Sequence, residues 1–400
     1  MIHLNFSKEG KTPFLLFLVI YYAILQSGNG FLLSSLSSST FLQNERLSLA
    51  SSPKWDKQRI RSLNKRMEGN NRDSMKALCR LRMATVELPN GTSAEVLSSN
   101  PTELTKNQQQ SKPTLVFIHG SFHAAWCWEE NYFDYFSKLG YDCFALSLRG
   151  TGGTFAGENV RKVKILEHVS DLEAFLEYIH TDNDEPKGKQ LKPVLIAHSF
   201  GGLAVMKYLE KMHPNQSPSD LLSGVTMFCS VPPSGNGPMT LRYLTRSLRD
   251  SWKITAGFAM KKCLKDSDLC RSLFFSTNDD PTGGISNDDI SRYQSYFDRD
   301  TAATIDLSDL AKQLPSARSN KDGSAPFIDN TKQCPALVVG ACDDFIVDIE
   351  GVDETAKYFN VLPTIVDSPH DVMLGPQWKS GAAVLSHWLD DIVNSIESES

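Results

Sequence analysis

The sequence contains Val194-Leu195-Ile196-Ala197-His198-Ser199-Phe200-Gly201-Gly202, an apolar run that ends in a serine and two glycines. The run predicts a strand covered on both faces, and the apolar spacing of residues 202–212 predicts a helix after it. A serine at such a junction lies on a tight, strained turn that presents its hydroxyl above the sheet. Gly201 lets strand and helix pass closely, whereas Ala197 stands where turns of this kind more often have glycine. Ser199 is the candidate nucleophile; the alternative is a serine that only caps the helix.

Runs of the same apolar, branched type recur along the chain. They are residues 114–119, 143–148, 193–197, 225–229 and 336–339. A helical pattern at Ile165–Ile179 lies between two of them, and Asn90-Gly91 between alternating runs predicts an opening hairpin. Strands that alternate with helices in this way form a doubly wound, mostly parallel sheet. The predicted fold class is therefore α/β, within a folded domain over about 80–400.

The interval between Cys229 and Cys334 breaks this alternation. It is too long for a crossover loop, and its patterns are helical without a convincing central strand. We interpret it as an inserted helical cap at about 234–333, above the carboxyl edge of the sheet, where open α/β sheets bind ligands. Its large apolar residues either line a pocket or form the core of the cap. They are Met239, Leu244, Trp252, Phe258, Met260, Phe274, Phe275, Tyr293, Tyr296 and Phe297.

A serine hydroxyl needs a base that removes its proton. His370 lies in the loop between the last predicted strand and the terminal helix, from which it can extend over the sheet edge toward Ser199. His119 and His198 also lie near strand ends, where we expect them to bond to loop backbone. His119 and His123 have the spacing of a helical metal site, but they lie on a strand end and a loop without an apparent third ligand. No metal site is predicted.

The imidazole needs a carboxylate that orients it and stabilises its protonated form. Asp343 and Asp344 follow the apolar run 336–339. We prefer Asp344, because it leaves the strand end in the register in which Ile346-Val347 begins the next element; Asp343 remains the alternative.

A tetrahedral intermediate also needs two N–H donors at its oxyanion. Phe200 follows the nucleophile at the start of a helix and supplies one donor. The loop after the strand at 115–118 supplies the other, because Gly120 allows a tight turn that points the N–H of Ser121 inward.

The chain resembles the α/β-hydrolase superfamily from about Met83 to its carboxyl terminus. The resemblance rests on the turn around Ser199, the order Ser199, Asp344, His370, the pair His119-Gly120, and Leu148-Arg149-Gly150-Thr151-Gly152. The loop His119-Gly-Ser-Phe-His-Ala-Ala-Trp-Cys-Trp128 is similar to the HG-x-x-H-x-x-W-x-W loop of plant methylesterases and hydroxynitrile lyases, and to loops of bacterial lysophospholipase-like hydrolases. The resemblance implies serine-type acyl transfer beneath a cap. Ala197 and the large cap depart from the methylesterase pattern.

The composition is that of a globular protein and bounds the partners. The 400 residues are 40% hydrophobic and 22% charged, with a net charge of −6. An acidic balance argues against nucleic acid as a partner, since binding phosphates needs a basic face. Eight scattered cysteines are too few for a disulfide scaffold and contain no CxxC pair, so most are expected to be buried apolar residues.

The first part of the chain has the composition of a targeting sequence. Residues 14–25 form an apolar run behind Lys8 and Lys11, which is typical of a signal-peptide core at 1–30 rather than a membrane span. Residues 31–79 form a serine-rich, basic, acid-poor segment that is typical of a transit peptide or a disordered linker. Together they resemble the bipartite presequences of algae with secondary plastids. The expected location is a plastid, with the secretory pathway or the extracellular space as the alternative.

The expected function is hydrolysis of a carboxylic ester through an acyl-enzyme, with a small, apolar, lipid-like or aromatic substrate. No cofactor is implied, and no stable membrane span is expected in the mature chain. The alternatives are hydroxynitrile lyase-like or thioesterase chemistry on the same residues, and a ligand receptor with slow turnover. Dehalogenase or epoxide hydrolase chemistry is disfavoured, because such enzymes need an aspartate where Ser199 stands.

Overall fold

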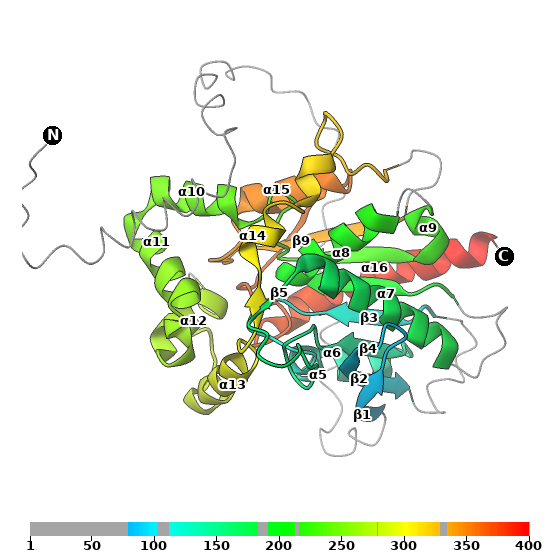
Figure 1. Cartoon of the computed structure of the whole chain (residues 1–400), viewed down its shortest axis with the longest axis horizontal. Coiled ribbons are helices and arrows are strands. Elements are labelled where there is room, and N and C mark those ends of the chain that lie inside the picture. The colour runs from blue at the N-terminus through cyan, green and yellow to red at the C-terminus, as the bar shows by residue number, and fades with distance from the viewer. Residues whose placement is uncertain are drawn as a thin grey trace, which may run out of the picture. The chain divides into compact units, whose positions relative to one another are not determined.

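The computed structural model describes residues 79–101, 112–182, 191–212, 216–277, 279–328 and 334–399. Their centre is an eight-stranded sheet with the strand order β1-β2-β4-β3-β6-β7-β9-β10 (Figure 1). The pairs from β4 to β10 are parallel, and β1 and β2 are antiparallel. The predicted doubly wound α/β class is confirmed.

The strands coincide with the apolar runs of the sequence. The first two, β1 (Cys79–Glu87) and β2 (Ser93–Pro101), form the predicted hairpin, with a backbone bond from Gly91 N–H to the Leu88 carbonyl of 2.8 Å. The others are β3 (Leu115–Ile118), β4 (Cys143–Leu146), β6 (Val194–His198), β7 (Gly224–Phe228), β9 (Ala336–Ala341) and β10 (Thr364–Val366).

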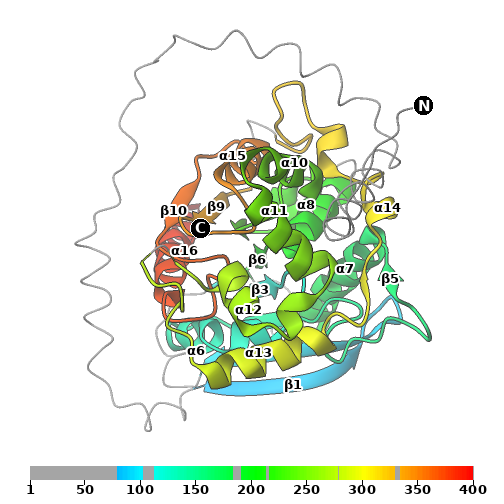
Figure 2. The ribbon, with the colours of Figure 1, turned by 90° about the vertical axis from the view of Figure 1, so that its left-hand side faces the viewer.

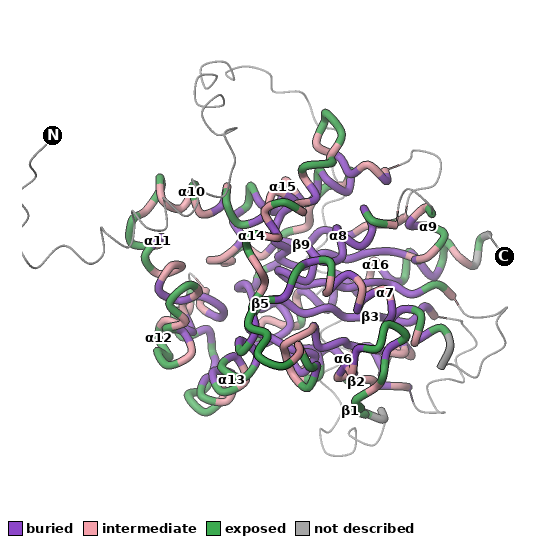
Figure 3. The backbone as a smooth tube through the Cα atoms, viewed as in Figure 1, coloured by how far each residue is buried: buried purple, intermediate pink, exposed green. Residues whose placement is uncertain are grey.

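Helices cover both faces of the sheet, which explains why its central strands are apolar throughout. In β3, Leu115 and Phe117 face one hydrophobic core, and Val116 and Ile118 face the other. The first core includes residues of α6 (Tyr132–Lys138) and α16 (Trp378–Glu399). The second includes residues of α7 (Ile165–Asp182), α8 (Phe200–Met212) and α15 (Ile349–Tyr358). Figure 3 shows the strands as a continuous buried layer between these helices.

The interval between β7 and β9 is largely helical, and none of its described residues adds a strand to the main sheet. Its elements are α10 (Asn236–Arg246), α11 (Leu248–Ile254), the π-helix η1 (Thr255–Ala259), η2 (Lys262–Leu264), α12 (Ser267–Phe274), α13 (Asn287–Arg299), α14 (Leu307–Leu310) and η3 (Pro315–Arg318). Helices α10 to α13 gather at one end of the sheet and lie on the viewer's side of it in the view onto that end (Figures 1 and 2). A short parallel pair, β5 (Lys162–Val163) with β8 (Thr304–Ile305), ties the interval to the core.

The proposed signal segment 1–30, and 31–78 of the proposed transit segment, lie outside the described residues. Within the described part, no helix has the length and apolar character needed to cross a membrane. The described cysteines form no disulfide, and five of the seven, Cys127, Cys143, Cys229, Cys263 and Cys270, are buried, as the sequence predicted.

Candidate active site

Ser199 stands on a strained turn between β6 and α8. Its φ angle is 52°, in the left-handed region that side chains with a Cβ rarely adopt. Three backbone bonds fix this conformation: Ser199 N–H donates to the Phe228 carbonyl at 3.0 Å, and its carbonyl accepts from Gly202 and Val231 at 3.1 Å each. A Cβ on Gly201 would lie 2.5 Å from the His119 carbonyl oxygen, so glycine is required for the helix to start beside β3. The predicted strand–turn–helix context of Ser199 is present.

His370 and Asp344 meet at the same edge of the sheet. His370 follows β10 and Asp344 follows β9, and the parallel neighbours β6, β7, β9 and β10 end together there. The Nδ1 atom of His370 lies 2.9 Å from each carboxylate oxygen of Asp344. Asp344 Oδ1 also accepts from the backbone N–H groups of Ile346 at 2.8 Å and Val347 at 2.9 Å. The backbone of Ile346 and Val347, whose register favoured Asp344, therefore holds the Asp344 carboxylate. Asp343 lies one residue earlier, and its backbone N–H donates to the Ser368 carbonyl.

The pair has the electrostatics of a base and its orienting acid. Burial disfavours the protonated form of His370, but the charge and hydrogen bond of Asp344, with a further contribution from Asp371, outweigh burial and raise the pKa of His370. Because Nδ1 is held by Asp344, Nε2 is the ring atom left to exchange a proton with a nucleophile.

His198 links the turn of Ser199 to the loop of His370. Its Nε2 donates to the His370 carbonyl at 3.0 Å, and the two ring centroids lie 4.7 Å apart. Burial, with the nearby charge of His370, lowers the pKa of His198 well below its ordinary value, so the ring is neutral. His119 is also buried, which lowers its pKa to about 3, and its ring bonds to Gly120 O and Leu148 N. Both histidines bond to loop backbone, as the sequence predicted.

The loop after β3 passes directly against Ser199. A Cβ on Gly120 would lie 2.7 Å from Ser199 Cβ and 3.1 Å from His198 Nδ1, so the loop can come this close only with glycine. Ser121 follows and is exposed, unlike its buried neighbours. Phe200 begins α8, and the N–H groups of a first helical turn have no partner within the helix. Gly120 of this loop thus lies against Ser199, and Phe200 follows Ser199 in sequence. The roles of the Ser121 and Phe200 N–H groups as oxyanion donors stay a prediction.

The remaining residues of this loop bond to acids that the sequence did not single out. Trp126 Nε1 donates to Asp300 Oδ2 at 2.9 Å, and Gly152 N–H donates to Asp300 Oδ1 at 2.8 Å. His123 Nε2 lies 3.1 Å from Asp371 Oδ2. Asp300 follows α13 and Asp371 follows His370, and both are buried. The burial of Asp300 and Asp371 is the signal that points to these contacts, since acids are seldom buried without a partner.

An aromatic cluster covers the reaction centre. Phe122 lies 5.1 Å from Phe258, 6.1 Å from Phe274 and 6.3 Å from Phe297, measured between ring centroids. Phe274 lies 6.4 Å from the His370 ring. Ser199 is 7% exposed and His370 2%, so the cap closes over both. Of the apolar cap residues considered from the sequence, Trp252 and Met260 are exposed, whereas Phe258, Phe274 and Phe297 belong to this cluster.

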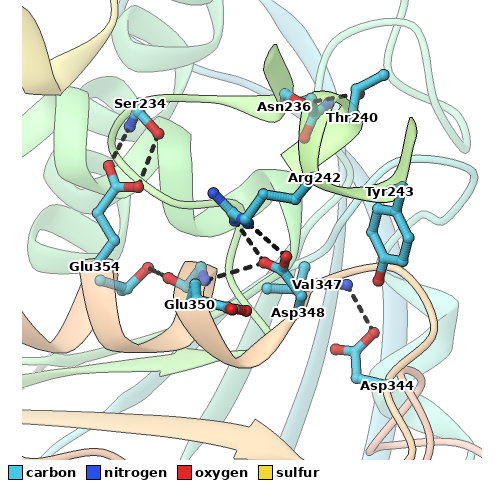
Figure 4. Close-up of polar contacts among 12 residues, drawn as sticks. Ser234, Asn236, Thr240, Arg242, Tyr243, Asp344, Val347, Asp348, Glu350 and Glu354 are labelled. Atoms are coloured by element: carbon cyan, nitrogen blue, oxygen red, sulfur yellow. Dashed lines mark hydrogen bonds and ion pairs between the residues drawn. The ribbon is translucent and has the colours of Figure 1, made fainter. Parts of the chain in front are cut away.

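The base of the cap is fastened to the loop of Asp344 (Figure 4). Arg242 of α10 forms two bonds to Asp348, of 2.6 and 2.5 Å. Ser234 donates to Glu354 through its N–H at 2.9 Å and its hydroxyl at 2.8 Å, and the Tyr243 hydroxyl donates to the Phe345 carbonyl at 3.0 Å. At the other end of the cap, Asp300 holds α13. The cap is therefore anchored on both sides of the helices that cover Ser199.

A cleft of about 970 Å³ lies beside this anchor rather than over Ser199. It runs between α11, α12 and the loop 342–345, and it reaches Asp344. Its lining includes charged residues (Lys253, Arg271 and Asp343) as well as apolar ones (Ile285 and Phe345), and neither Ser199 nor His370 lines it. We therefore place the reaction centre under the aromatic cluster and not in this cleft.

Three groups of side chains bring ligand-type atoms within 4.8 Å of one another in the described part of the chain. They are His198, His370 and Asp371; Cys229, Asp344 and His370; and Cys342, Asp343 and Asp367. In the first two groups, one ring nitrogen of each histidine is already bonded: His198 Nε2 to the His370 carbonyl and His370 Nδ1 to Asp344. Burial raises the pKa of the Cys229 thiol well above its ordinary value, which keeps it from acting as a thiolate ligand. The third group is exposed, as acidic clusters without an ion commonly are.

Comparisons with known proteins identify relatives of this chain and of its fold. The chain is 30% identical to Methylesterase 10 of Arabidopsis thaliana over 155 residues, which are 38% of this chain and 48% of that protein. It is 28% identical to Methylesterase 2 of Arabidopsis thaliana over 110 residues, 26% of this chain and 36% of the relative. The matched stretches cover less than half of either relative. A putative lipase from Acinetobacter baumannii AYE shares the fold, with a TM-score of 0.52 at 14% identity over 89% of this chain and 100% of the other. The model of the alpha/beta hydrolase family matches residues 115–378, and the chain belongs to that family.

Proposed function

We propose that this protein is a serine hydrolase that cleaves a carboxylic ester through an acyl-enzyme. The observation that carries the proposal is the Asp344–His370 hydrogen bond, at 2.9 Å, at the sheet edge where the strained turn presents Ser199. A buried carboxylate on Nδ1 orients the imidazole and stabilises its protonated form, which is the arrangement that lets a histidine activate a neighbouring hydroxyl. The two relatives named as methylesterases support ester chemistry.

In the proposed reaction, Ser199 Oγ attacks the ester carbonyl while His370 Nε2 takes the hydroxyl proton. His370 then gives this proton to the leaving alcohol, and water hydrolyses the acyl-enzyme by the same route. Asp344 keeps Nδ1 protonated and stabilises the imidazolium. The N–H groups of Ser121 and Phe200 bind the oxyanion.

The aromatic cluster supports an apolar acyl or aromatic substrate. Phe122, Phe258, Phe274 and Phe297 cover the centre, and a charged acyl chain would lose its hydration there without a partner. An apolar chain would instead be stabilised by roughly 25 cal/mol for each Å² of surface removed from water. We infer that turnover rises with acyl length until the space beneath the cap is filled.

The test is labelling and turnover of Ser199→Ala. We expect this variant to lose both fluorophosphonate labelling and hydrolysis of p-nitrophenyl esters, while its circular dichroism stays that of the unsubstituted protein. The matched control is Ser368→Ala, which removes a buried hydroxyl that has no hydrogen-bond partner within the described residues. Equal labelling of both variants would overturn the assignment. A panel of graded esters, thioesters and cyanohydrins distinguishes ester hydrolysis from the thioesterase and lyase alternatives.

A further inference from the structure

A second histidine–aspartate pair lies beside the proposed triad. His123 Nδ1 lies 2.8 Å from the Ser121 carbonyl oxygen, and His123 Nε2 lies 3.1 Å from Asp371 Oδ2. The side chains of His123 and Asp371 are 1% and 0% exposed. The pair thus connects the proposed oxyanion loop to the residue that follows His370.

The partners of His123 fix its hydrogens. A carbonyl oxygen only accepts hydrogen bonds, so Nδ1 must carry the proton that it donates to Ser121. In a neutral ring Nε2 would then be a lone pair facing the carboxylate of Asp371. Both contacts are satisfied only when the pair holds one more proton, as an imidazolium with a carboxylate or as an imidazole with a carboxylic acid. In either form His123 Nδ1 donates to the Ser121 carbonyl and so restrains the backbone of Ser121.

We propose that His123 and Asp371 form a clamp that positions the Ser121 N–H for the oxyanion. This inference rests on the proposed ester hydrolysis. His123 and Asp371 are positioning residues: they act through the backbone of Ser121 and take no part in proton transfer with the substrate. Their effect falls on the transition state, because the oxyanion forms there and not in the bound ester.

The described residues around His123 and Asp371 do not replace the hydrogen bonds of this pair. The His123 ring stacks at 5.7 Å from Trp126 and lies 4.8 Å from Phe297, so aromatic side chains pack against it. Asp371 N–H donates to the Phe274 carbonyl of the cap at 3.2 Å. Asp371 Oδ1 has no hydrogen-bond partner among the described residues, and its nearest cationic-type atom is His198 Nε2 at 4.0 Å. Other titratable groups that interact with the pair are His119, His198, His370, Cys127, Cys229 and Cys270.

Substitutions at Asp371 separate a clamp from a simple charge effect on His370. In Asp371→Asn, the amide donates to the lone pair of Nε2 in a neutral ring, so Nδ1 still holds Ser121. In Asp371→Leu, that bond is lost. Both variants remove the same carboxyl group from the neighbourhood of His370, so any effect of its charge on His370 is equal in the two. A clamp therefore predicts a large effect for leucine and a small one for asparagine, whereas a charge effect predicts equal losses.

The experiment measures p-nitrophenyl butyrate hydrolysis and affinity for a trifluoromethyl ketone that mimics the oxyanion. For Asp371→Leu we expect kcat and inhibitor affinity to fall together by at least about tenfold, within the roughly 10²–10³-fold limit for losing a whole donor. KM should change by less than about twofold. Asp371→Asn should retain kcat within about threefold. Equal losses in both variants, or no loss in either, would overturn the proposal.

Two further measurements keep the test decisive. The double variant His123→Phe/Asp371→Leu replaces both buried polar partners by apolar groups, which preserves folding better than leaving one unpaired; we expect it to lose no more activity than Asp371→Leu. Amide hydrogen exchange of a peptide covering 119–125 should quicken about tenfold in Asp371→Leu and stay unchanged in Asp371→Asn, with a peptide covering 200–212 as reference. Exchange needs no turnover, so an unsubstituted protein without esterase activity would refute the proposed function and still leave the clamp tested.

Discussion

Replacing Asp344 by asparagine tests the proposed triad at its carboxylate. The carboxylate accepts three hydrogen bonds: one from His370 Nδ1–H, shared by its two oxygens at 2.9 Å, and two from the backbone of Ile346 and Val347. An asparagine can keep the backbone bonds through its oxygen, but its amide then donates to Nδ1. This reverses the tautomer of His370 and leaves a proton on Nε2, where the base must be free.

The expected loss follows from this reversal. In a serine hydrolase the same change lowers kcat by about 10⁴-fold, which is roughly 5 kcal/mol of transition-state stabilisation. Burial then acts on His370 without the opposing carboxylate, so the pKa of His370 should fall as well. The assay is kcat for p-nitrophenyl butyrate, with circular dichroism to confirm folding.

Asp343→Asn is the matched control, because Asp343 is adjacent in sequence and only partly buried. We expect it to retain kcat within about threefold, as surface substitutions away from a site usually do. A severe loss in Asp343→Asn with little loss in Asp344→Asn would show that the acid has been misassigned.

The remaining predictions concern the loop, the cap, pH and the amino-terminal segment. Gly120→Ala puts a methyl 2.7 Å from Ser199 Cβ, so we expect its kcat to fall about 10²-fold. Gly237→Ala, whose Cβ meets nothing within 4 Å, should keep its kcat, and equal kcat in the two variants would refute the close approach. Asp300→Ala removes the acceptor of Trp126 Nε1, of the Gly152 N–H and of the Arg299 guanidinium, so it should lower the free energy of unfolding by about 2–4 kcal/mol in urea titrations. The exposed Asp298→Ala should lower it by less than about 0.5 kcal/mol. The neutral ring of His370 is the base and its pKa is raised, so kcat/KM should rise with pH through a midpoint above the ordinary pKa of an imidazole. A midpoint well below that pKa would contradict the contact with Asp344. A fluorescent protein fused behind residues 1–79 should enter the secretory pathway and then a plastid in an alga with secondary plastids, and a cytosolic signal would count against the targeting interpretation.

The sequence predicted the sheet because its strands are local patterns, and the residues of the proposed triad were chosen from the same patterns. Each buried strand is an apolar run, and the serine, the acid and the histidine each follow such a run at the sheet edge. Asp344 could be preferred to Asp343 because Ile346-Val347 fixed the register of the strand end. In the structure Asp344 accepts from two backbone N–H groups and bonds to His370, and its role as the triad acid stays a prediction.

What the sequence could not provide are contacts between distant residues. His123 and Asp371 are 248 positions apart, and Trp126 and Asp300 are 174 positions apart. No periodicity relates such residues, since their approach depends on how the cap and two loops pack. The same holds for the cap itself, where amphipathic spacing predicts helices but does not tell whether Phe274 or Trp252 turns inward.

Mass spectrometry of the protein quenched during turnover of a slowly hydrolysed ester tests the central claim most directly. If Ser199 forms an acyl-enzyme, we expect a single added acyl mass on the tryptic peptide that contains Ser199. This mass should be absent in Ser199→Ala and lost when hydrolysis is allowed to finish. Turnover at full rate without that adduct, or an adduct on another residue, would contradict the claim.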